Sequence, residues 1–347
     1  MTELRIIDFG RVSALRSQSI WHALAASAGK GGPTTLSFMR PGSSYVGIGM
    51  HRSIQEVDQE YCQSNGLPIY RRQVGGGPVY LDDKQLFFQV SSRREALPIS
   101  RSAAISKVLR PFKSAFIAAG INADLDETGE FAVNGAKVCG HGAGEIEGGV
   151  VVVGNLIEKF DYVRAASIVN IADVRVKLEI ESIMRRFVGV FANDINSEAF
   201  KDEAVASLSN ALELNPKVSV LTDEEWKLVE AYDELLGDSS WTKNPEFLPA
   251  LPRPLRVVKI RAGVYVVYNS VRGRQFLFSV VFGIVESMIL EFEDFASNSG
   301  EKFELGVSLK NKSVDDVVAV LVSEGLLLDA EVAVLANAGV LLKEIAA

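Results

Sequence analysis

The segment from Arg71 to Asp82, with the sequence RRQVGGGPVYLD, combines residue types that could together bind an anion. Its three consecutive glycines allow the backbone to adopt positive φ angles and to approach a ligand closely. Successive N–H groups in such a turn form a concavity that binds anions. The guanidinium groups of Arg71 and Arg72 would suit a carboxylate or a phosphate. A flexible hairpin with two solvated arginines is the alternative interpretation.

Lys137 is the second candidate, because it follows Asn134-Gly135, the strongest short-range signal for a β-hairpin. A compact ammonium group can bridge two oxygen atoms, although a single lysine is more often a solvated surface residue. Cys139 lies two residues further on, so on a strand its side chain would share a face with Lys137. A nearby lysine could lower the pKa of a nucleophilic thiol. A small buried apolar residue is the other interpretation of Cys139.

The composition excludes several classes of protein. The 347 residues are 48% hydrophobic and 23% charged, which is typical of globular chains and long enough for two domains. A net charge of −8 predicts no affinity for nucleic acid. No apolar run approaches the ~18–20 residues of a membrane span, and no signal peptide is visible. The two cysteines and three histidines form no ligand motif, so we expect no metal held by protein side chains and a reducing cytoplasm.

The elements that must position these residues are predicted to be mixed over the first 250 residues. Strands are expected at 4–8, 34–40, 45–48, 68–73, 79–80, 85–90, 131–133, 137–139 and 150–158, and helices at 12–28, 53–65, 102–119, parts of 167–191, and 222–237. Capping boxes at Ser53 and Thr222 mark two helix starts.

Four prolines between 245 and 254 predict a linker. Strands at 257–260, 264–268, 275–282 and 285–292 and helices at 313–325 and 329–345 follow it. We therefore predict a mixed α/β (α+β) domain over 1–248 and a small α+β domain over 249–347.

The glycine string resembles the RRxxGGGAVxHD motif of lipoate–protein ligases, which belong to the biotin/lipoate ligase superfamily. The stretch GEFAVNGAKVCG at 129–140 resembles the lysine block of that family, and VGNLI at 153–157, followed by Asp161, sits where the family has an HGT motif. The segment after Trp241 looks like the accessory domain of these ligases. The resemblance therefore spans almost the whole chain. The sequence departs from the family pattern at His22, Pro78, Leu81, Gly129, Glu130, His141 and Val153.

The resemblance implies a ligase-like catalytic domain, built on a mixed sheet with flanking helices, and an accessory domain. It implies activation of lipoate or octanoate with ATP and Mg²⁺ to an acyl-adenylate, then transfer of the acyl group to a lysine of a lipoyl carrier domain. Lys137 matches the family lysine that touches both the acyl carbonyl oxygen and the phosphate. The implied contacts of ATP and lipoyl-adenylate are Arg72, Gly75, Gly76, Gly77, Pro78, Val79, Tyr80, Asp82 and Lys137.

Three other functions stay open at this point. An octanoyl or lipoyl transferase of the same superfamily would use a cysteine thioester, for which Cys139 is the candidate nucleophile. A non-catalytic module that binds a lipoyl carrier would keep the fold and the glycines without needing Lys137. A biotin ligase would have a different glycine-rich loop. Apolar residues near the lysine hairpin and near Trp21 could line a slot for an eight-carbon chain.

Overall fold

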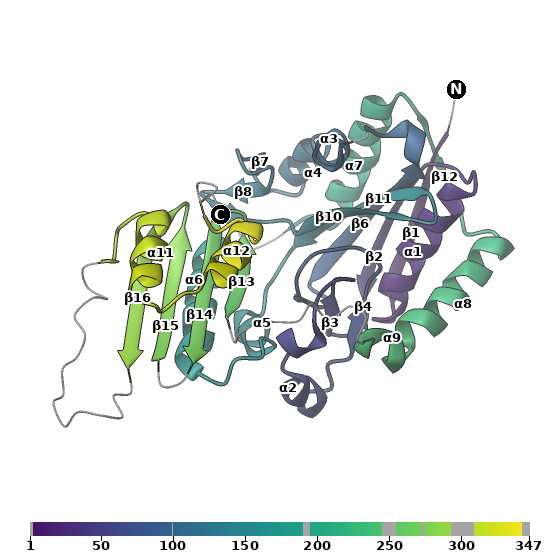
Figure 1. Cartoon of the computed structure of the whole chain (residues 1–347). Helices are drawn as coiled ribbons and strands as arrows, with labels where there is room; N and C mark the ends of the chain where they lie inside the picture. Colours follow the sequence, from purple (N-terminus) through teal and green to yellow (C-terminus); the bar gives the residue numbers. More distant parts are fainter. Residues whose placement is uncertain are drawn as a thin grey trace. The chain divides into compact units, whose positions relative to one another are not determined.

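The computed structural model describes residues 3–98, 100–189, 195–244, 255–271, 274–292 and 309–341. The chain forms two compact units (Figure 1). The first contains Met1–Asn170 and Gly189–Pro249, and the second contains Ile171–Val188 and Ala250–Ala347. Both units combine strands with helices, so the predicted mixed fold is confirmed. Within the described residues, no helix has the length and apolar character needed to cross a membrane.

A six-stranded mixed sheet with the order β10-β11-β6-β2-β1-β12 forms the centre of the first unit. β1 runs parallel to β2 and β12, and the other neighbours are antiparallel. The strand bounds are β1 Glu3–Val12, β2 Thr35–Pro41, β6 Gln85–Arg93, β10 His141–Ile146, β11 Gly149–Ile157 and β12 Asn215–Val218.

Helices cover both faces of this sheet, because the apolar side chains of its strands alternate between two cores. Phe38 and Phe88 point to one core, which is closed by α3 (Arg101–Leu109), α4 (Phe112–Ala118) and α7 (Ser197–Leu212). Met39 and Phe87 point to the other, which is closed by α1 (Arg16–Gly29) and α8 (Asp223–Gly237). A strand buried on both faces gives a rigid support for the segments that leave its ends.

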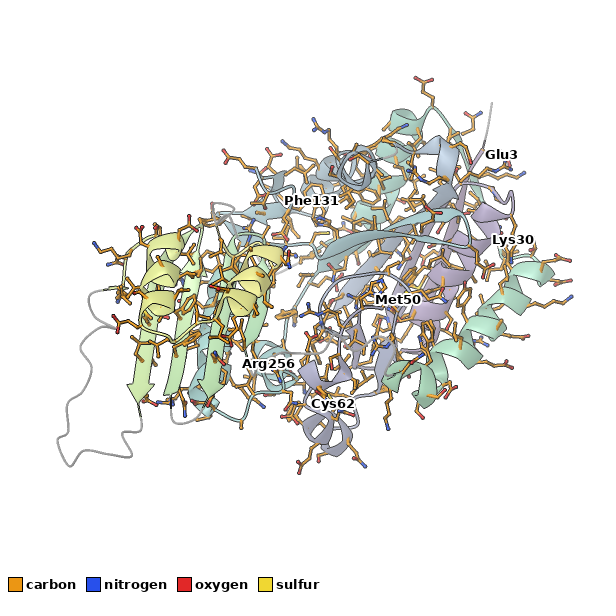
Figure 2. The ribbon with its side chains drawn as sticks, viewed as in Figure 1. Glu3, Lys30, Met50, Cys62, Phe131 and Arg256 are labelled. Carbon is orange, nitrogen blue, oxygen red and sulfur yellow. The ribbon has the colours of Figure 1, made fainter. Side chains whose placement is uncertain are left out.

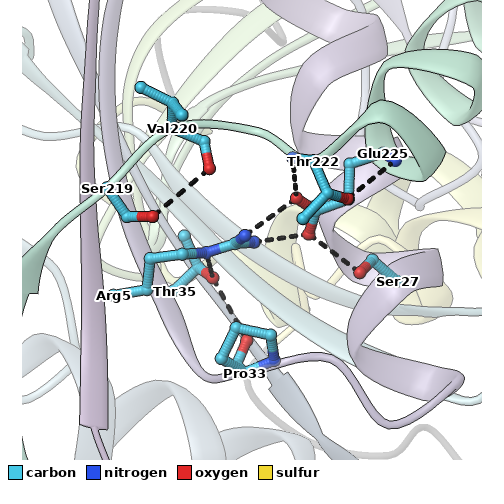
Figure 3. A network of polar contacts seen from close by, with 8 residues as sticks. All are labelled: Arg5, Ser27, Pro33, Thr35, Ser219, Val220, Thr222 and Glu225. Carbon is cyan, nitrogen blue, oxygen red and sulfur yellow. Dashed lines mark hydrogen bonds and ion pairs between the residues drawn. The ribbon is translucent and has the colours of Figure 1, made fainter.

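A buried ion pair joins three of these elements. The guanidinium of Arg5 on β1 donates to both carboxylate oxygens of Glu225 on α8, at 2.8 and 2.6 Å. Figure 3 shows that Ser27, on α1, also donates to this carboxylate, at 2.9 Å. The same carboxylate accepts from the backbone N–H of Thr222 and so completes the predicted capping box. One glutamate therefore begins a helix and fixes it to the sheet.

Two small three-stranded sheets of the first unit carry the sequence candidates. In one sheet, β3 (Tyr45–Ile48) lies between β4 (Ile69–Arg71) and β5 (Val79–Leu81), and the triple glycine connects β4 to β5. In the other, β8 (Phe131–Val133) lies between β7 (Asp124–Leu125) and β9 (Ala136–Lys137). In Figure 2 the label of Met50, in the loop after β3, locates the first of these sheets, and the label of Phe131, on β8, locates the second. The remaining helices of this unit are α2 (Gln59–Ser64), α5 (Tyr162–Ser167) and α9 (Ser239–Lys243), with single 3₁₀ turns at Ile54–Glu56 and Arg94–Ala96.

Several predicted bounds were wrong for local reasons. The helix expected at 12–28 begins at Arg16, because Val12 still belongs to β1. The capping box of Ser53 closes only a 3₁₀ turn, and Asp58 caps α2 separately. The helix expected at 102–119 is broken at Pro111 into α3 and α4, since proline cannot supply the N–H that a helix interior needs. Sequence reasoning missed β10, α7 and β12.

The second unit has an antiparallel meander of β13 (Arg256–Arg261), β14 (Val264–Val271), β15 (Arg274–Val281) and β16 (Ile284–Phe292). α11 (Val314–Ser323) and α12 (Asp329–Asn337) close its core on one face. The helix predicted at 329–345 stops earlier, and Gly339 follows at φ 75°. The predicted proline linker at 245–254 and the end of the last predicted helix lie outside the described residues.

A helix from the middle of the chain also belongs to the second unit. α6 (Val174–Phe187) packs on the face of the meander opposite to α11 and α12 (Figure 1). Its arginines pair with carboxylates of β16: Arg175 with Glu291 at 2.5 Å and Arg186 with Glu286 at 2.7 Å. The second unit is therefore not continuous in sequence, because α6, which lies well before the expected linker, completes it.

Candidate functional site

The triple glycine forms a loop in which each glycine has a different requirement. Gly76 has φ 101°, a conformation that side-chain-bearing residues rarely adopt. A β-carbon at Gly76 would also lie 2.5 Å from Nη2 of Arg72. Gly75 and Gly77 do not have positive φ angles, and a β-carbon on either would meet open space. Only Gly76 is therefore required by the conformation of the loop itself.

Gly49, at the end of β3, lets this loop pack closely, and sequence reasoning did not single it out for that role. A β-carbon at Gly49 would lie 2.0 Å from the carbonyl oxygen of Gly76. The N–H of Met50 donates to the carbonyl of Val74 at 3.0 Å and fixes the two segments together.

The two adjacent arginines have opposite surroundings. Arg71 is fully buried, and its guanidinium donates to the carbonyls of Gly49, Met50, Arg52 and Thr242 at 2.7 to 3.1 Å. These bonds hold the guanidinium of Arg71 in the protein interior, so the expectation that it faces an anion was wrong. It acts as a clamp on the backbone around the glycine loop.

Arg72 lies against the glycine loop and is half-buried. Its Nε donates to the carbonyl of Gly75 at 3.1 Å and its Nη2 to that of Gly77 at 2.9 Å. Its buried Nη1 has no hydrogen-bond partner among the described residues. Burial lowers the pKa of Arg72 to about 10, which keeps the guanidinium charged at neutral pH. The loop thus holds a cation whose buried Nη1 is without a partner among the described residues.

His22 on α1 anchors the other side of the loop. Its Nε2 accepts from the backbone N–H of Gln73 at 3.1 Å, and its Nδ1 lies 2.8 Å from the carbonyl of Gln18. These partners assign a neutral ring with the proton on Nδ1. Burial holds the pKa of His22 at about 3. The sequence marked His22 only as a departure from the family pattern, and its role in holding the loop needed the structure.

The remaining predicted contacts after the loop divide into exposed and buried residues. Val79 is exposed and Pro78 is half-buried. Tyr80 is buried and its hydroxyl donates to Ser44 at 3.0 Å. Asp82 is buried, and its carboxylate accepts from the N–H of Lys84 at 3.0 Å. Burial raises the pKa of Asp82. In this structure the side chains of Tyr80 and Asp82 therefore form hydrogen bonds with other residues of the protein.

The predicted hairpin at Asn134-Gly135 is confirmed, with φ angles of 49° and 81° at these two residues. Its strand β8 is anchored by Phe131, which is fully buried and packs 4.6 Å from the ring of Phe116. Lys137, on β9, is half-buried, and its Nζ pairs with the carboxylate of Glu130 at 2.9 Å. Lys137 is therefore an oriented side chain and not one of the solvated lysines of the surface.

Cys139 does not have the surroundings of a nucleophile. Its side chain is completely buried in the core that includes α4 and α7. Burial raises the pKa of the Cys139 thiol to about 12, so the thiol stays protonated at neutral pH. Because the thiolate is the reactive form, the structure does not support a thioester at this residue. Cys62 lies on α2, far from the strand of Phe131 (Figure 2).

Side chains from the central sheet contact the lysine block at 129–140 and continue toward the strand after the glycine loop. Asn155 on β11 accepts from the N–H of Gly140, three residues after Lys137, at 2.5 Å. It also donates to Gln85 on β6, at 2.7 Å. Asp161, from the third motif block, caps α5 by accepting from the N–H of Arg164 at 3.0 Å. Sequence reasoning listed Asn155 within a motif and missed Gln85 entirely.

The half-buried Lys137 and the charged Arg72 lie in two connections of the first unit, the Asn134-Gly135 hairpin and the glycine loop between β4 and β5. The family of this domain is shown by sequence: residues 14–212 match the model of the lipoyl protein ligase A/B catalytic domain. The chain belongs to this family.

Two curated relatives are similar to part of the chain. Lipoate–protein ligase 1 of Staphylococcus aureus is 28% identical over 183 residues, which are 51% of this chain and 54% of the relative. Lipoate–protein ligase LplJ of Bacillus subtilis is 25% identical over 206 residues, 56% of this chain and 60% of the relative. The matches therefore span little more than half the length of these relatives.

Solved structures share the fold at low identity. A bipartite lipoate protein ligase from Thermoplasma acidophilum, studied with its E2 lipoyl domain, has a TM-score of 0.64 and 20% identity over 72% of this chain and 98% of its own. Lipoate–protein ligase A bound with ATP has a TM-score of 0.59 and 19% identity over 70% and 99%. LipL1 of Plasmodium falciparum in complex with lipoate has a TM-score of 0.52 and 14% identity over 90% of each chain.

Proposed function

We propose that this chain is an ATP-dependent lipoate–protein ligase. It would activate lipoate or octanoate as the acyl-adenylate and transfer the acyl group to one lysine of a lipoyl carrier domain. The observation that carries the proposal is that Lys137 lies half-buried beside the hairpin turn, with its Nζ paired with the carboxylate of Glu130 at 2.9 Å. The names of the relatives and the ATP and lipoate bound in related structures support it.

In the first step, a carboxylate oxygen of the acid attacks the α-phosphorus of ATP, and the bond to pyrophosphate breaks. Two anions must approach each other, so preorganised positive groups are needed. Arg72 would supply a charged guanidinium, whose buried Nη1 has no partner among the described residues and would bind a phosphate oxygen once it is uncovered. Lys137 would bridge the acyl carbonyl oxygen and the phosphate once a ligand replaces Glu130 as its partner.

The glycine loop would contact the phosphates through its backbone. Gly75 and Gly77 are exposed and have open space where a β-carbon would lie, so a ligand can approach the main chain there. Gly76, Pro78, Val79 and Tyr80 belong to the same proposed surface. Asp82 would lie at the edge of this surface. Mg²⁺ would enter with the phosphates of ATP, as this ion commonly does in nucleotide sites.

In the second step, the ε-amine of the carrier lysine attacks the acyl carbon. The bond to the phosphate oxygen breaks, AMP leaves with the electron pair, and the amine loses a proton. We assign both steps to the first unit, within the catalytic domain predicted at 1–248, and an accessory role to 249–347. We also infer that α6, although it lies within 1–248, belongs functionally with the accessory part. Cys62 and Cys139, both within the described residues, are buried thiols that form no disulfide, which fits a reducing cytoplasm.

The deciding experiment measures pyrophosphate release from ATP and Mg²⁺ with lipoate or octanoate, with and without an apo lipoyl domain. We expect pyrophosphate release with the acid and acylation of the carrier that requires ATP. Acyl transfer from a loaded carrier without ATP would identify a transferase. Binding of the carrier with neither reaction would identify a non-catalytic module. The buried thiol of Cys139 argues against the transferase.

A further inference from the structure

A pair of buried amide side chains lies between the two motif blocks. Asn155, on β11, is 8% exposed, and Gln85, on β6, is 1% exposed. Burying an amide is costly unless its polar atoms find partners. An apolar pair would fill this part of the sheet without that cost. The presence of two amides therefore calls for an explanation beyond packing.

The hydrogen bonds of this pair run in a single direction. The backbone N–H of Gly140 can only donate, so the atom of Asn155 that faces it, at 2.5 Å, must be Oδ1. The other end of this amide, Nδ2, then donates to Oε1 of Gln85 at 2.7 Å. Nε2 of Gln85 consequently faces the carbonyl of Tyr80 at 3.5 Å and the carboxylate of Asp82 at 3.4 Å.

The two ends of this chain of bonds are the two halves of the proposed site. Gly140 follows Lys137 by three residues, and the segment between them is fixed to β11 by two backbone bonds: the N–H of Asn155 donates to Gly140 at 3.0 Å, and that of Ile157 to Val138 at 3.3 Å. Tyr80 belongs to β5, which begins directly after the glycine loop. One amide pair therefore connects the lysine segment to the strand that carries the loop.

We propose that Asn155 and Gln85 are positioning residues, which hold the lysine hairpin and the glycine loop at a fixed separation. They touch neither substrate, so they act through Gly140 and Tyr80. The activity part of this inference rests on the proposed ligase function, whereas the structural part does not. Each half would still bind its own ligand group if the pair were broken. The alignment of both groups in the transition state would be lost, and small misplacements of reacting groups cost up to about 100-fold in rate.

The chain offers a matched control on the same strand. Gln89 is also on β6 and is 2% exposed, but its amide oxygen accepts from Ser37 on β2 at 3.0 Å. Replacing Gln85 or Gln89 by methionine keeps the length of the side chain and removes one buried amide in each case. A merely structural role for Gln85 would make the two variants behave alike.

Hydrogen–deuterium exchange tests the structural part without any activity. In Gln85→Met, we expect faster exchange in peptides covering 134–142, including the amide of Gly140, by about fivefold, the size expected for weakening one hydrogen bond. Gln89→Met should leave these peptides unchanged. Asn155→Asp, which keeps an acceptor for Gly140, should accelerate exchange less than Asn155→Leu. If Gln85→Met affects only its own strand, or if both methionine variants act alike, the inference is wrong.

Steady-state kinetics tests the rest. For Gln85→Met we expect kcat of pyrophosphate release to fall about 10- to 100-fold, with KM for ATP changed less than about threefold, since ATP would bind mainly at the loop. Gln89→Met should keep wild-type kcat. If the wild-type protein releases no pyrophosphate, the proposed function fails and the exchange experiment alone decides the inference. An unchanged kcat in Gln85→Met, with active wild type, overturns it.

Discussion

The glycine loop and the lysine hairpin belong to one proposed site, but the protein holds them by different means. The loop is fixed through its main chain: Arg71 binds the carbonyls around it, His22 accepts from Gln73, and Gly76 adopts a left-handed conformation. The hairpin has an ordinary two-residue turn and a buried Phe131, and its functional group is a single side chain paired with Glu130.

The loop therefore contributes mainly the shape of its backbone, and the hairpin contributes mainly the charge of one side chain. The loop is already open at Gly75 and Gly77, so an anion can approach the main chain there, whereas the unpartnered Nη1 of Arg72 is buried and must first be uncovered. Lys137 already has an anionic partner, so a ligand must compete with Glu130 for it. Changes in the hairpin should therefore affect the reaction most, whereas changes in the loop should affect both stability and binding.

The largest effect is expected for Lys137→Ala. Removing a charged group that acts on the transition state typically costs about 10²–10³ in rate, and we expect this loss in pyrophosphate release. Lys113→Ala is the control, because Lys113 also pairs with a carboxylate, that of Asp124 at 2.7 Å, next to the same small sheet. Near wild-type rates in a folded Lys137→Ala variant would contradict the assignment of the hairpin.

His22, which anchors the glycine loop, can gain a proton, so we expect the free energy of unfolding to depend on pH. The pKa of His22 is about 3 in the folded protein, because burial disfavours the charged ring and Arg72 adds repulsion. An unfolded histidine titrates near pH 6.5, so between these values the unfolded state binds more protons. Stability from His22 is thus present above pH ~6.5 and falls as the pH is lowered toward 3, by roughly 2 kcal/mol at pH 5.

Urea unfolding at pH 7.5 and pH 5 measures this effect. The drop in unfolding free energy between the two pH values should shrink in His22→Gln, whose amide has no proton to gain. His51→Gln, a change at an exposed histidine, should keep the drop of the wild type. Equal drops in all three proteins would show that His22 does not couple the loop to pH.

Local rules in the sequence predicted the elements whose causes are local. Asn134-Gly135 gave the hairpin and Thr222 with Glu225 gave a helix start, because each motif satisfies its own backbone groups. β12 was missed because all four of its residues are exposed at a sheet edge and leave no alternating pattern. α7 was missed although Asn196, which caps it, is a readable signal.

The site was predictable to the extent that a residue's role is carried by its motif. Arg71 and Arg72 are neighbours of the same type, and only distant partners separate them: the carbonyl of Thr242 lies 171 residues from Arg71 in sequence. Burial decided the case of Cys139, since its spacing from Lys137 gave no information on the core around it. Gln85 matched no expected motif and acquires its role only through Asn155.

Gly77→Ala tests whether the open space of the loop serves a ligand. The new β-carbon would meet no protein atom within 4 Å, and Gly77 has no positive φ. We therefore expect an unchanged unfolding midpoint but ATP binding weakened about tenfold, since a methyl group would occupy the path of the phosphates. Calorimetric titration with a non-hydrolysable ATP analogue measures the affinity. Normal affinity would mean that no ligand approaches the backbone at Gly77.

Gly76→Ala should differ from Gly77→Ala by losing stability as well. Forcing alanine into the left-handed region costs about 1 kcal/mol, and its β-carbon would collide with Arg72. Gly31→Ala is the control for strain alone, because Gly31 has a similar φ of 98° and its β-carbon would lie 3.6 Å from the nearest neighbour. Both variants should melt earlier, but only Gly76→Ala should bind ATP more weakly.

The smallest effect is expected for Cys139→Ser, and the size of this effect separates the ligase from a thioester enzyme. A buried thiol with a pKa of about 12 is protonated at pH 8, so it should resist iodoacetamide at that pH in the folded state. A ligase does not use this sulfur, and the variant should keep ATP-dependent lipoylation within about twofold, with a stability loss of about 1 kcal/mol from placing a hydroxyl in an apolar core. Lys137 precedes Cys139 by only two residues, so the Cys139→Ser variant also serves as a comparison for Lys137→Ala. A collapse of acyl transfer in Cys139→Ser, together with an acyl group trapped on the wild-type cysteine, would transfer the chemistry of the hairpin from the amine to the thiol.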